Sequence, residues 1–182
     1  APRLDRESVS LRGYGAIRNM GLAVAAILNH DVVVFLDDDE IALDENFLVD
    51  AVYGLGLATR QGLPIVAKSG CFLNEKGSPY ARVERDRWWS KRMEFNQWMH
   101  RALSGTRISR SNHVCGGCFA VSARAFTRVG FDPAITRGED LDYLFNLRMQ
   151  GIDVWFDSAW RVGGGLGQAA EPVNHNVQQL VE

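Results

Sequence analysis

A run of acidic residues follows directly on an apolar stretch of the sequence. Residues 32–36 read Val-Val-Val-Phe-Leu, and Asp37, Asp38, Asp39 and Glu40 come next. Such an apolar run is typical of a buried strand, and ligands of open α/β sheets bind beyond the carboxyl ends of strands. Adjacent carboxylates repel one another unless they are neutralised, and hard oxygen ligands suit Mg²⁺ or Mn²⁺. The pattern indicates either a divalent-metal site that bridges a diphosphate or a solvated acidic turn.

A second pair of carboxylates, Glu139 and Asp140, opens a predicted helix just after Gly138. The glycine lets the backbone approach a ligand closely. An ionised carboxylate at this point can accept a proton from an attacking hydroxyl. It can equally be a plain helix cap, stabilised by the helix dipole. Both interpretations remain open from these residues alone.

A third segment, residues 13–21, places glycines ahead of a predicted helix whose first turn carries Arg18. The planar fork of an arginine suits phosphate oxygens or base edges. The alternative is a loose helix start with an exposed arginine. The sequence leaves this choice open as well.

The elements that must position these residues alternate between helices and strands, which favours a mixed α/β sheet. Apolar periodicity predicts a helix over 15–30, and the run at 31–36 predicts a central parallel strand buried on both faces. Asp44 is expected to cap a helix that runs to about residue 62. Further predicted elements are a strand at 64–69, a helix over 82–104, a strand at 114–121, a short helix after Ser122, a helix over 140–150 and a strand at 152–156.

The chain reads as one domain over 1–182, with no convincing internal boundary. It opens on what resembles the middle of a nucleotide-binding fold, because no strand with a phosphate or base loop precedes Gly13. We therefore expect a single catalytic domain that lacks the usual N-terminal nucleotide-binding strand or strands.

Composition narrows the class of protein. The hydrophobic content of 46% and charged content of 23% are ordinary for a globular protein. No apolar run approaches the roughly 18–20 residues that span a bilayer. The net charge of −2 argues against nucleic acid as the main partner. Three cysteines do not form a disulfide framework, so we expect a cytoplasmic protein, or one peripheral at a membrane.

Two of those cysteines, Cys115 and Cys118, have the spacing of redox and zinc motifs. A structural zinc site needs four ligands, and of the other residue types that bind zinc only His113 lies nearby. A buried strand and turn is the interpretation that we favour.

The segment 82–110 holds eight arginines or lysines against three acids, with Trp88, Trp89 and Trp98 among them. One interpretation is an amphipathic helix whose long basic side chains cover its own apolar face. The other is recruitment of an anionic acceptor or contact with a membrane surface.

In their order and spacing, these segments resemble the GT-A glycosyltransferases, in particular the family 2-like group. The matching segments are Arg18-Asn19, Asp37-Asp38-Asp39, Gly116-Gly117-Cys118-Phe119-Ala120, Arg124, Gly130-Phe131-Asp132 and Gly138-Glu139-Asp140. The resemblance implies an α/β, Rossmann-like GT-A fold, with a mixed, mostly parallel sheet flanked by helices. It also implies a Mn²⁺- or Mg²⁺-dependent transferase that moves a sugar from a UDP- or GDP-sugar to a hydroxyl acceptor.

The resemblance further implies roles on the donor side. Asp39 would bind the metal, and Asp37 would contact the nucleotide ribose or the metal through water. Asp38 and Arg18 would contact the nucleotide-sugar. Many GT-A enzymes also place a metal-binding histidine after the last strand, where this chain has Arg161-Val162-Gly163. His175 lies further on and is the candidate to fold back to the metal.

On the acceptor side, the resemblance implies that Gly116 and Gly117 line the sugar and acceptor site. Asp140 would be the catalytic base in an inverting enzyme, with Glu139 positioning the acceptor or sugar.

Two other functions are alternatives to glycosyl transfer. A sugar-phosphate nucleotidyltransferase shares the diphosphate chemistry, but its glycine-rich N-terminal signature is not visible here. A non-catalytic GT-A-like module would bind sugar only. It need not retain both the 37–39 cluster and Asp140, and this chain has both.

Overall fold

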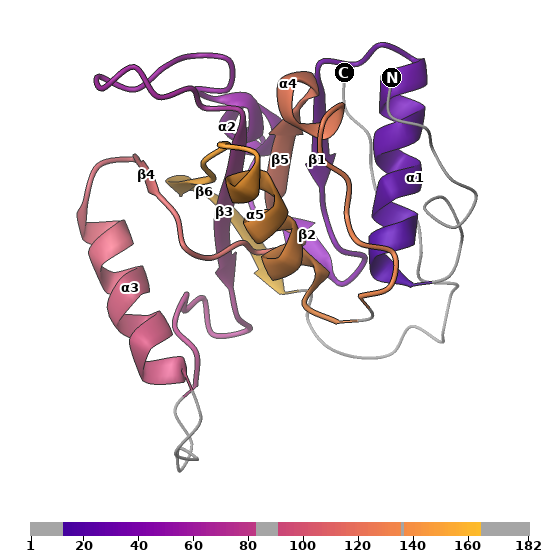
Figure 1. The fold of residues 1–182 in the computed structure, drawn as a ribbon. Coiled ribbons are helices and arrows are strands. Elements are labelled where there is room, and N and C mark those ends of the chain that lie inside the picture. Colours follow the sequence, from indigo (N-terminus) through magenta and orange to yellow (C-terminus); the bar gives the residue numbers. More distant parts are fainter. Residues whose placement is uncertain (1–12, 83–90, 136, 165–182) are drawn as a thin grey trace.

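The computed structural model describes residues 13–82, 91–135 and 137–164. These residues form one mixed sheet with helices on its faces (Figure 1). In chain order the elements are α1 Tyr14–Ile27, β1 Val32–Phe35, β2 Glu40–Ala42, α2 Phe47–Val52, β3 Ala67–Leu73, α3 Arg92–Ser104, β4 Ile108–Arg110, β5 Phe119–Ser122, α4 Ala123–Phe126, α5 Glu139–Met149 and β6 Trp155–Gly164. No helix within the described ranges has the length and apolar character needed to cross a bilayer.

The strands follow the order β1-β5-β3-β6-β2, and β4 pairs with β6 beside this path. The mixed sheet is confirmed, but the balance of strand directions differs from expectation. Among the described strands only β3 and β6 pair in parallel, and the other pairings are antiparallel. The expected central parallel strand is β1, but it lies at one end of the strand order and pairs antiparallel with β5. An apolar run reports burial on both faces, and it does not report the direction of the partner strand.

The strand directions still place the candidate site residues at one edge of the sheet. Because β5 runs antiparallel to both β1 and β3, while β6 runs parallel to β3, the strands β1, β3 and β6 all point the same way. Their carboxyl ends therefore share an edge with the amino end of β5. This edge holds the acidic run after β1 and the Gly116-Gly117 pair before β5.

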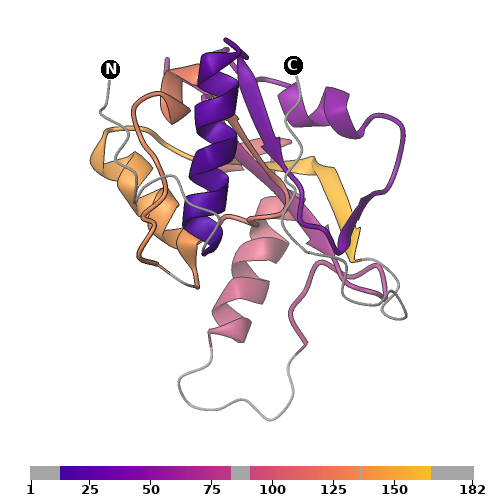
Figure 2. The same ribbon diagram turned by 90° about the vertical axis from the view of Figure 1, so that its right-hand side faces the viewer.

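Alternating side chains of β1 divide the core into two layers. Val33 and Phe35 pack with residues of α1, α4 and α5 on one face of the sheet. Val34 packs with Phe47 and Ala51 of α2 on the other face. Figure 2 shows α1 lying alongside the segment that leads from α4 to α5. The sheet is thus covered on both faces, as an α/β fold requires.

Helix α2 is shorter than the sequence predicted. It ends at Val52 rather than near residue 62, because Gly54, Gly56 and Gly62 all adopt positive φ, which does not continue a right-handed helix. Beyond the helix the chain doubles back, with Gly56 N–H donating to Ile65 O at 2.8 Å. Helix α5 ends as predicted, with Gly151 at φ 72° just after it.

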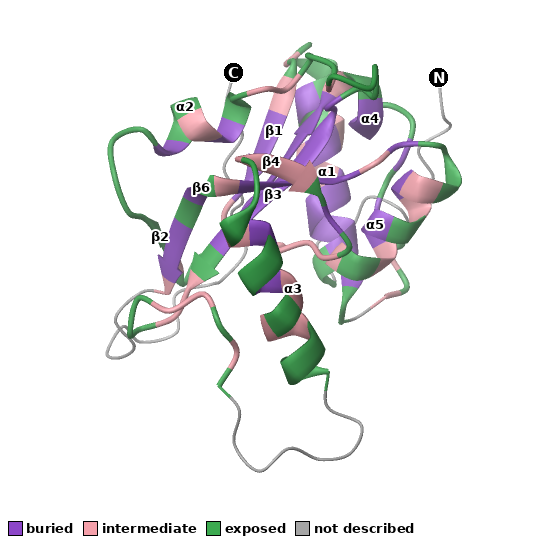
Figure 3. Ribbon diagram, turned by 90° about the vertical axis from the view of Figure 1, so that its left-hand side faces the viewer, coloured by how far each residue is buried: buried purple, intermediate pink, exposed green. Residues whose placement is uncertain are grey.

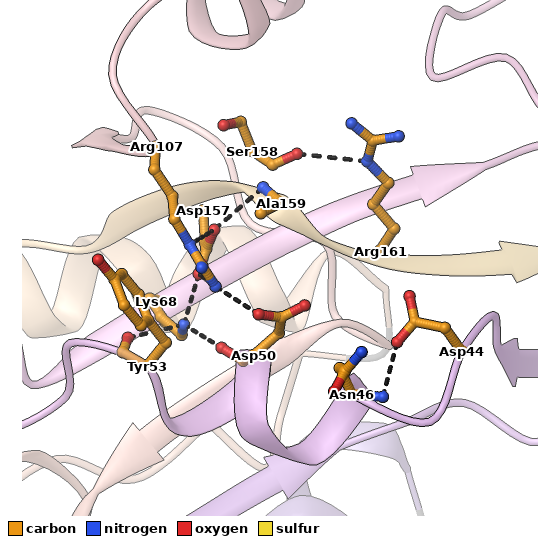
Figure 4. A network of polar contacts seen from close by, with 10 residues as sticks. All are labelled: Asp44, Asn46, Asp50, Tyr53, Lys68, Arg107, Asp157, Ser158, Ala159 and Arg161. Carbon is orange, nitrogen blue, oxygen red and sulfur yellow. Dashed lines mark hydrogen bonds and ion pairs between the residues drawn. The ribbon is translucent and has the colours of Figure 1, made fainter.

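A buried ion pair joins β3 to β6, as Figure 4 shows. Lys68 and Asp157 are both fully buried, and their Nζ and Oδ2 atoms lie 2.7 Å apart. Lys68 also donates to the backbone carbonyls of Asp50 and Tyr53 at the end of α2. Arg107 pairs with Asp157 at 3.0 Å and with Asp50 at 2.6 Å. Such a network fixes the place of α2 against the parallel strand pair.

Candidate active site

The acidic run forms a turn at the end of β1. Glu40 N–H donates to Asp37 O at 3.1 Å, and β2 begins at Glu40. Asp38 and Asp39 are exposed, whereas Asp37 and Glu40 are half-buried. The turn thus exposes Asp38 and Asp39 to solvent, whereas Asp37 and Glu40 are partly covered by the protein.

Arg18 gathers the separate motifs into one site. Its side chain is almost fully buried, with the residue 2% exposed. Nη2 lies 3.2 Å from Asp37 Oδ1 and 3.5 Å from Glu139 Oε1, and Nη1 donates to Gly116 O at 3.1 Å. The rings of Phe35 and Phe131 lie 5.5 and 5.6 Å from the guanidinium carbon. In this structure the guanidinium fork is occupied by groups of the protein itself.

Asn19, the next residue of α1, holds the loop that leads towards Glu139. Its Nδ2 donates to Phe131 O at 2.8 Å, and its Oδ1 accepts from Phe131 N–H at 2.7 Å. A Cβ on Gly15 would lie 2.5 Å from Asp132 O, so only glycine permits this approach of the helix to the loop. The contacts explain why an Arg-Asn pair and a Gly-Phe-Asp segment occur together in the sequence.

The glycine pair before β5 makes room for site side chains. A Cβ on Gly116 would lie 2.7 Å from Arg18 Nη2, and one on Gly117 would overlap the Glu40 carboxylate. The immediate neighbours of Gly116 and Gly117 are therefore Arg18 and Glu40. A larger residue at either position would displace the groups that shape the acidic edge. By this name we mean the edge of the sheet where Asp37–Glu40 follow β1.

The acidic edge carries more negative charge than Arg18 neutralises. Burial raises the pKa of Asp37, and the neighbouring Asp39, Glu139 and Asp38 add to this effect, although Arg18 opposes it. Burial, followed by repulsion from Asp37, raises the pKa of Glu40 to about 7. Glu40 Oε2 is buried and has no hydrogen-bond partner among the described residues. An edge of this kind favours a bound cation or proton.

A divalent ion fits the donor chemistry of this edge, although the protein does not enclose it. Within the described part of the chain, no group of three or more His, Cys, Asp or Glu side chains is arranged to hold a metal ion. Mg²⁺ characteristically binds through one or two carboxylates, several waters and substrate phosphates, rather than in an all-protein cage. The exposed Asp39 meets that requirement. His175 lies outside the described residues.

The predicted base and its neighbour occupy different surroundings. Gly138 adopts the left-handed conformation, with φ 79°, and α5 begins at Glu139. Glu139 is 8% exposed and faces Arg18. Asp140 is half-buried, and its Oδ1 accepts from Leu141 N–H at 2.7 Å. The Glu139–Arg18 contact was not foreseen, because sequence spacing does not show which of two adjacent carboxylates turns inward.

The paired cysteines form a tight turn that leads into β5. Cys118 N–H donates to Cys115 O at 3.0 Å, and Cys115 N–H donates to Ser69 Oγ at 2.8 Å. Burial raises the pKa of both thiols, and that of Cys71 to about 11. Thiols with raised pKa values are poor nucleophiles and poor metal ligands at neutral pH. The geometry agrees with a strand and turn.

The described part of the basic segment supports a structural role. Figure 3 shows α3 with an exposed outer side, while Met99 and Ala102 are buried against Phe156. Arg107 belongs to the Lys68 network, and Arg110 pairs with Asp153. Residues 83–90, including Trp88 and Trp89, lie outside the described residues.

A cavity of about 780 Å³ adjoins the acidic edge, with Asp39 and Cys115 among its lining residues. It lies between α3, the end of β3, the loop 74–82 and the segment before β5. Sequence reasoning did not find it, and the only signal was the cluster of aromatic residues in the predicted helix 82–104.

Comparison with known proteins identifies the family of the chain. The model of the family described as glycosyltransferase like family 2 matches residues 8–162. No curated protein matches the chain. The crystal structure of A197 from STIV is similar, with 14% sequence identity and a TM-score of 0.45, over 87% of this chain and 78% of that one.

Proposed function

The chain belongs to glycosyltransferase like family 2, and we propose that it transfers a sugar from a UDP- or GDP-sugar to a hydroxyl acceptor with the help of Mg²⁺ or Mn²⁺. The observation that carries the proposal is the placement of Arg18. One buried side chain contacts Asp37, Gly116 and Glu139, which come from three separate segments of the family pattern. Such convergence at a sheet edge supports a shared ligand site.

On the donor side, Asp39 takes the metal, because it is exposed at the tip of the acidic turn. The metal, when bound, neutralises charge on the leaving diphosphate. Asp37, whose Oδ1 is held by Arg18 on the protein side of the turn, is the proposed contact to the nucleotide ribose or, through water, to the metal. Asp38 lies between them and completes the donor-binding run.

On the acceptor side, Asp140 is the proposed base. In an inverting reaction the acceptor oxygen bonds to the anomeric carbon, the bond from that carbon to the diphosphate oxygen breaks, and the acceptor proton passes to the carboxylate. Asp140 lies in the first turn of α5. Glu139, held by Arg18, positions the start of this helix against the acidic edge.

A binding experiment tests the donor assignment. Thermal unfolding is followed with UDP-, GDP- and TDP-sugars, each with Mn²⁺ or with EDTA, because a ligand that binds the folded state raises the melting temperature. We expect a shift for one nucleotide class that requires the ion and is lost in Asp39→Asn. Asp31→Asn, an exposed aspartate at the opposite end of β1, is the matched control. A shift that survives in Asp39→Asn contradicts the assignment.

A further inference from the structure

One wall of the cavity beside the acidic edge is formed by aromatic rings. Its lining includes Phe72, Tyr80, Phe95, Trp98 and Phe156. It also reaches Asp39, the proposed metal-binding residue. A molecule in this cavity therefore lies next to the proposed reaction centre.

The wall is held in place by contacts among its own rings. Trp98 lies 4.6 Å from His113 and 5.2 Å from Phe156, measured between ring centroids. Phe95 meets His113 edge to face at 5.4 Å. Phe156 and Met99 are buried, which anchors this wall to the core. The aromatic surface is thus formed before any ligand arrives.

Three neutral polar side chains of the lining, Ser69, Asn74 and Ser78, are engaged within the protein. Asn74 Nδ2 donates to Tyr80 O, and its Oδ1 accepts from the N–H groups of Lys76 and Ser78. Ser78 Oγ accepts from Tyr80 N–H at 3.3 Å. Ser69 Oγ accepts from Cys115 N–H at 2.8 Å and lies within hydrogen-bond reach of Cys118 O. A polyhydroxyl ligand would therefore depend mainly on the charged side chains of the lining for the hydrogen bonds that replace its bonds to water.

The charges of the lining are balanced. Lys76 and Arg82 are matched by Asp39 and Glu75. Among the described residues, the lining therefore has no excess of positive charge that would select a phosphorylated ligand. Burial lowers the pKa of His113, which disfavours the cationic form of this lining residue.

We propose that this cavity binds the acceptor, and that the acceptor hydroxyl is carried by an apolar body, either an aromatic ring system or an alkyl chain. The apolar body packs on the wall formed by Trp98 and Phe95, with its hydroxyl at the acidic edge, where Arg18 holds Glu139, the neighbour of the proposed base Asp140. This inference rests on the proposed function, since it names the substrate class of the same site.

Equilibrium binding tests the proposal without a known donor. The probes are 2-naphthol and 1-octanol, with methyl β-glucopyranoside as the polar comparison, followed by calorimetry and saturation-transfer NMR. Farnesol in phosphatidylcholine vesicles, followed by flotation, distinguishes a membrane-borne alcohol from a soluble one. Phe72→Ala and Tyr80→Ala truncate rings that are 38% and 37% exposed, so the fold should survive. Phe145→Ala, at a residue 52% exposed on α5, is the control.

We expect at least one apolar alcohol to bind, and binding to weaken about three- to tenfold in Phe72→Ala and Tyr80→Ala. The Phe145→Ala protein should bind as the unaltered protein does. Binding of the glucoside in preference to every alcohol, or equal weakening in Phe145→Ala, overturns the proposal.

Mn²⁺-dependent nucleotide-sugar binding is measured on the same samples. If that binding persists while no alcohol binds, the acceptor class is wrong and the proposed function stands. If only the nucleotide-sugar fails to bind, the proposed function fails, and with it the identification of the cavity ligand as an acceptor.

Discussion

Arg18 Nη2 lies 3.5 Å from Glu139 Oε1, which ties the first described helix to the start of α5 across 121 positions of the chain. Both residues are nearly buried. The contact places the Glu139-Asp140 pair beside the acidic turn, because the same Nη2 also meets Asp37. The relative position of the two carboxylate groups therefore depends on one guanidinium.

Replacing Arg18 should disturb both stability and the site. Arg18→Met leaves Glu139 buried without its cation and should lower the free energy of unfolding by about 3 kcal/mol or more. Arg18→Lys restores the charge, but a point charge does not reproduce a fork that reaches three partners, so donor binding should remain weak. Chemical denaturation and nucleotide-sugar titration measure the two effects. Arg101→Lys, on the exposed part of α3, should change neither, and equal effects in both lysine variants would contradict this role.

Glu40 should make stability fall as the pH rises. Its native pKa is about 7, above the ordinary value of 4.5, so between these values the native state holds a proton that the unfolded state has released. The free energy of unfolding should therefore decrease from about pH 4.5 to pH 7, and Glu40→Gln should flatten this part of the profile. Denaturation across this range in EDTA measures the slope. An unchanged slope in Glu40→Gln would show that another group titrates.

The buried pair of Lys68 and Asp157 should matter for folding and much less for chemistry. Lys68→Met leaves Asp157 fully buried with Arg107 as its remaining cation, and should cost about 3 kcal/mol. The double variant Lys68→Met with Asp157→Leu removes the unpaired charge and should recover part of this loss. Thermal and chemical denaturation give both values. A double variant less stable than Lys68→Met would contradict the assignment of the loss to an uncompensated charge.

The general fold could be predicted from the sequence because apolar runs report burial directly. The strand at 32–35 and the helices at 14–27 and 139–149 fall close to their predicted positions. Strand directions could not be predicted, because an apolar run such as Val32–Phe35 would be buried whether its neighbour were parallel or antiparallel. In the structure its neighbour β5 is antiparallel. The end of α2 was misplaced because its apolar periodicity continues through glycines that adopt positive φ.

The candidate site was only partly foreseeable. The types and spacing of Asp37, Asp39 and Asp140 suggested chemistry, but their roles remain predictions. The contacts of Arg18 depend on the tertiary approach of three segments, which spacing does not encode. The aromatic cavity likewise depends on how α3 packs against Phe156 and His113. Lys68, the second residue of β3, gave no sign of its buried partner on β6.

The roles of the two adjacent carboxylates should separate on substitution. Glu139→Gln keeps the shape of the side chain but weakens its hold on Arg18, so it should reduce transfer through positioning and lower stability slightly. Its pH–rate profile should keep the shape seen in the unaltered protein. If Glu139→Gln instead abolishes transfer and removes the acidic limb of the profile, Glu139 is the base.

Transfer by Asp140→Asn tests the central claim most directly. Asparagine is nearly isosteric and its Oδ1 can still accept from Leu141 N–H, so the variant should fold and bind the donor normally. Release of nucleoside diphosphate is measured with the donor identified by thermal shift, with Mn²⁺ and an acceptor alcohol. We predict that kcat for transfer falls by roughly 10²–10⁴-fold, the usual contribution of a general base. A kcat near that of the unaltered protein would contradict the account and leave Asp140 with only a structural role in the first turn of α5.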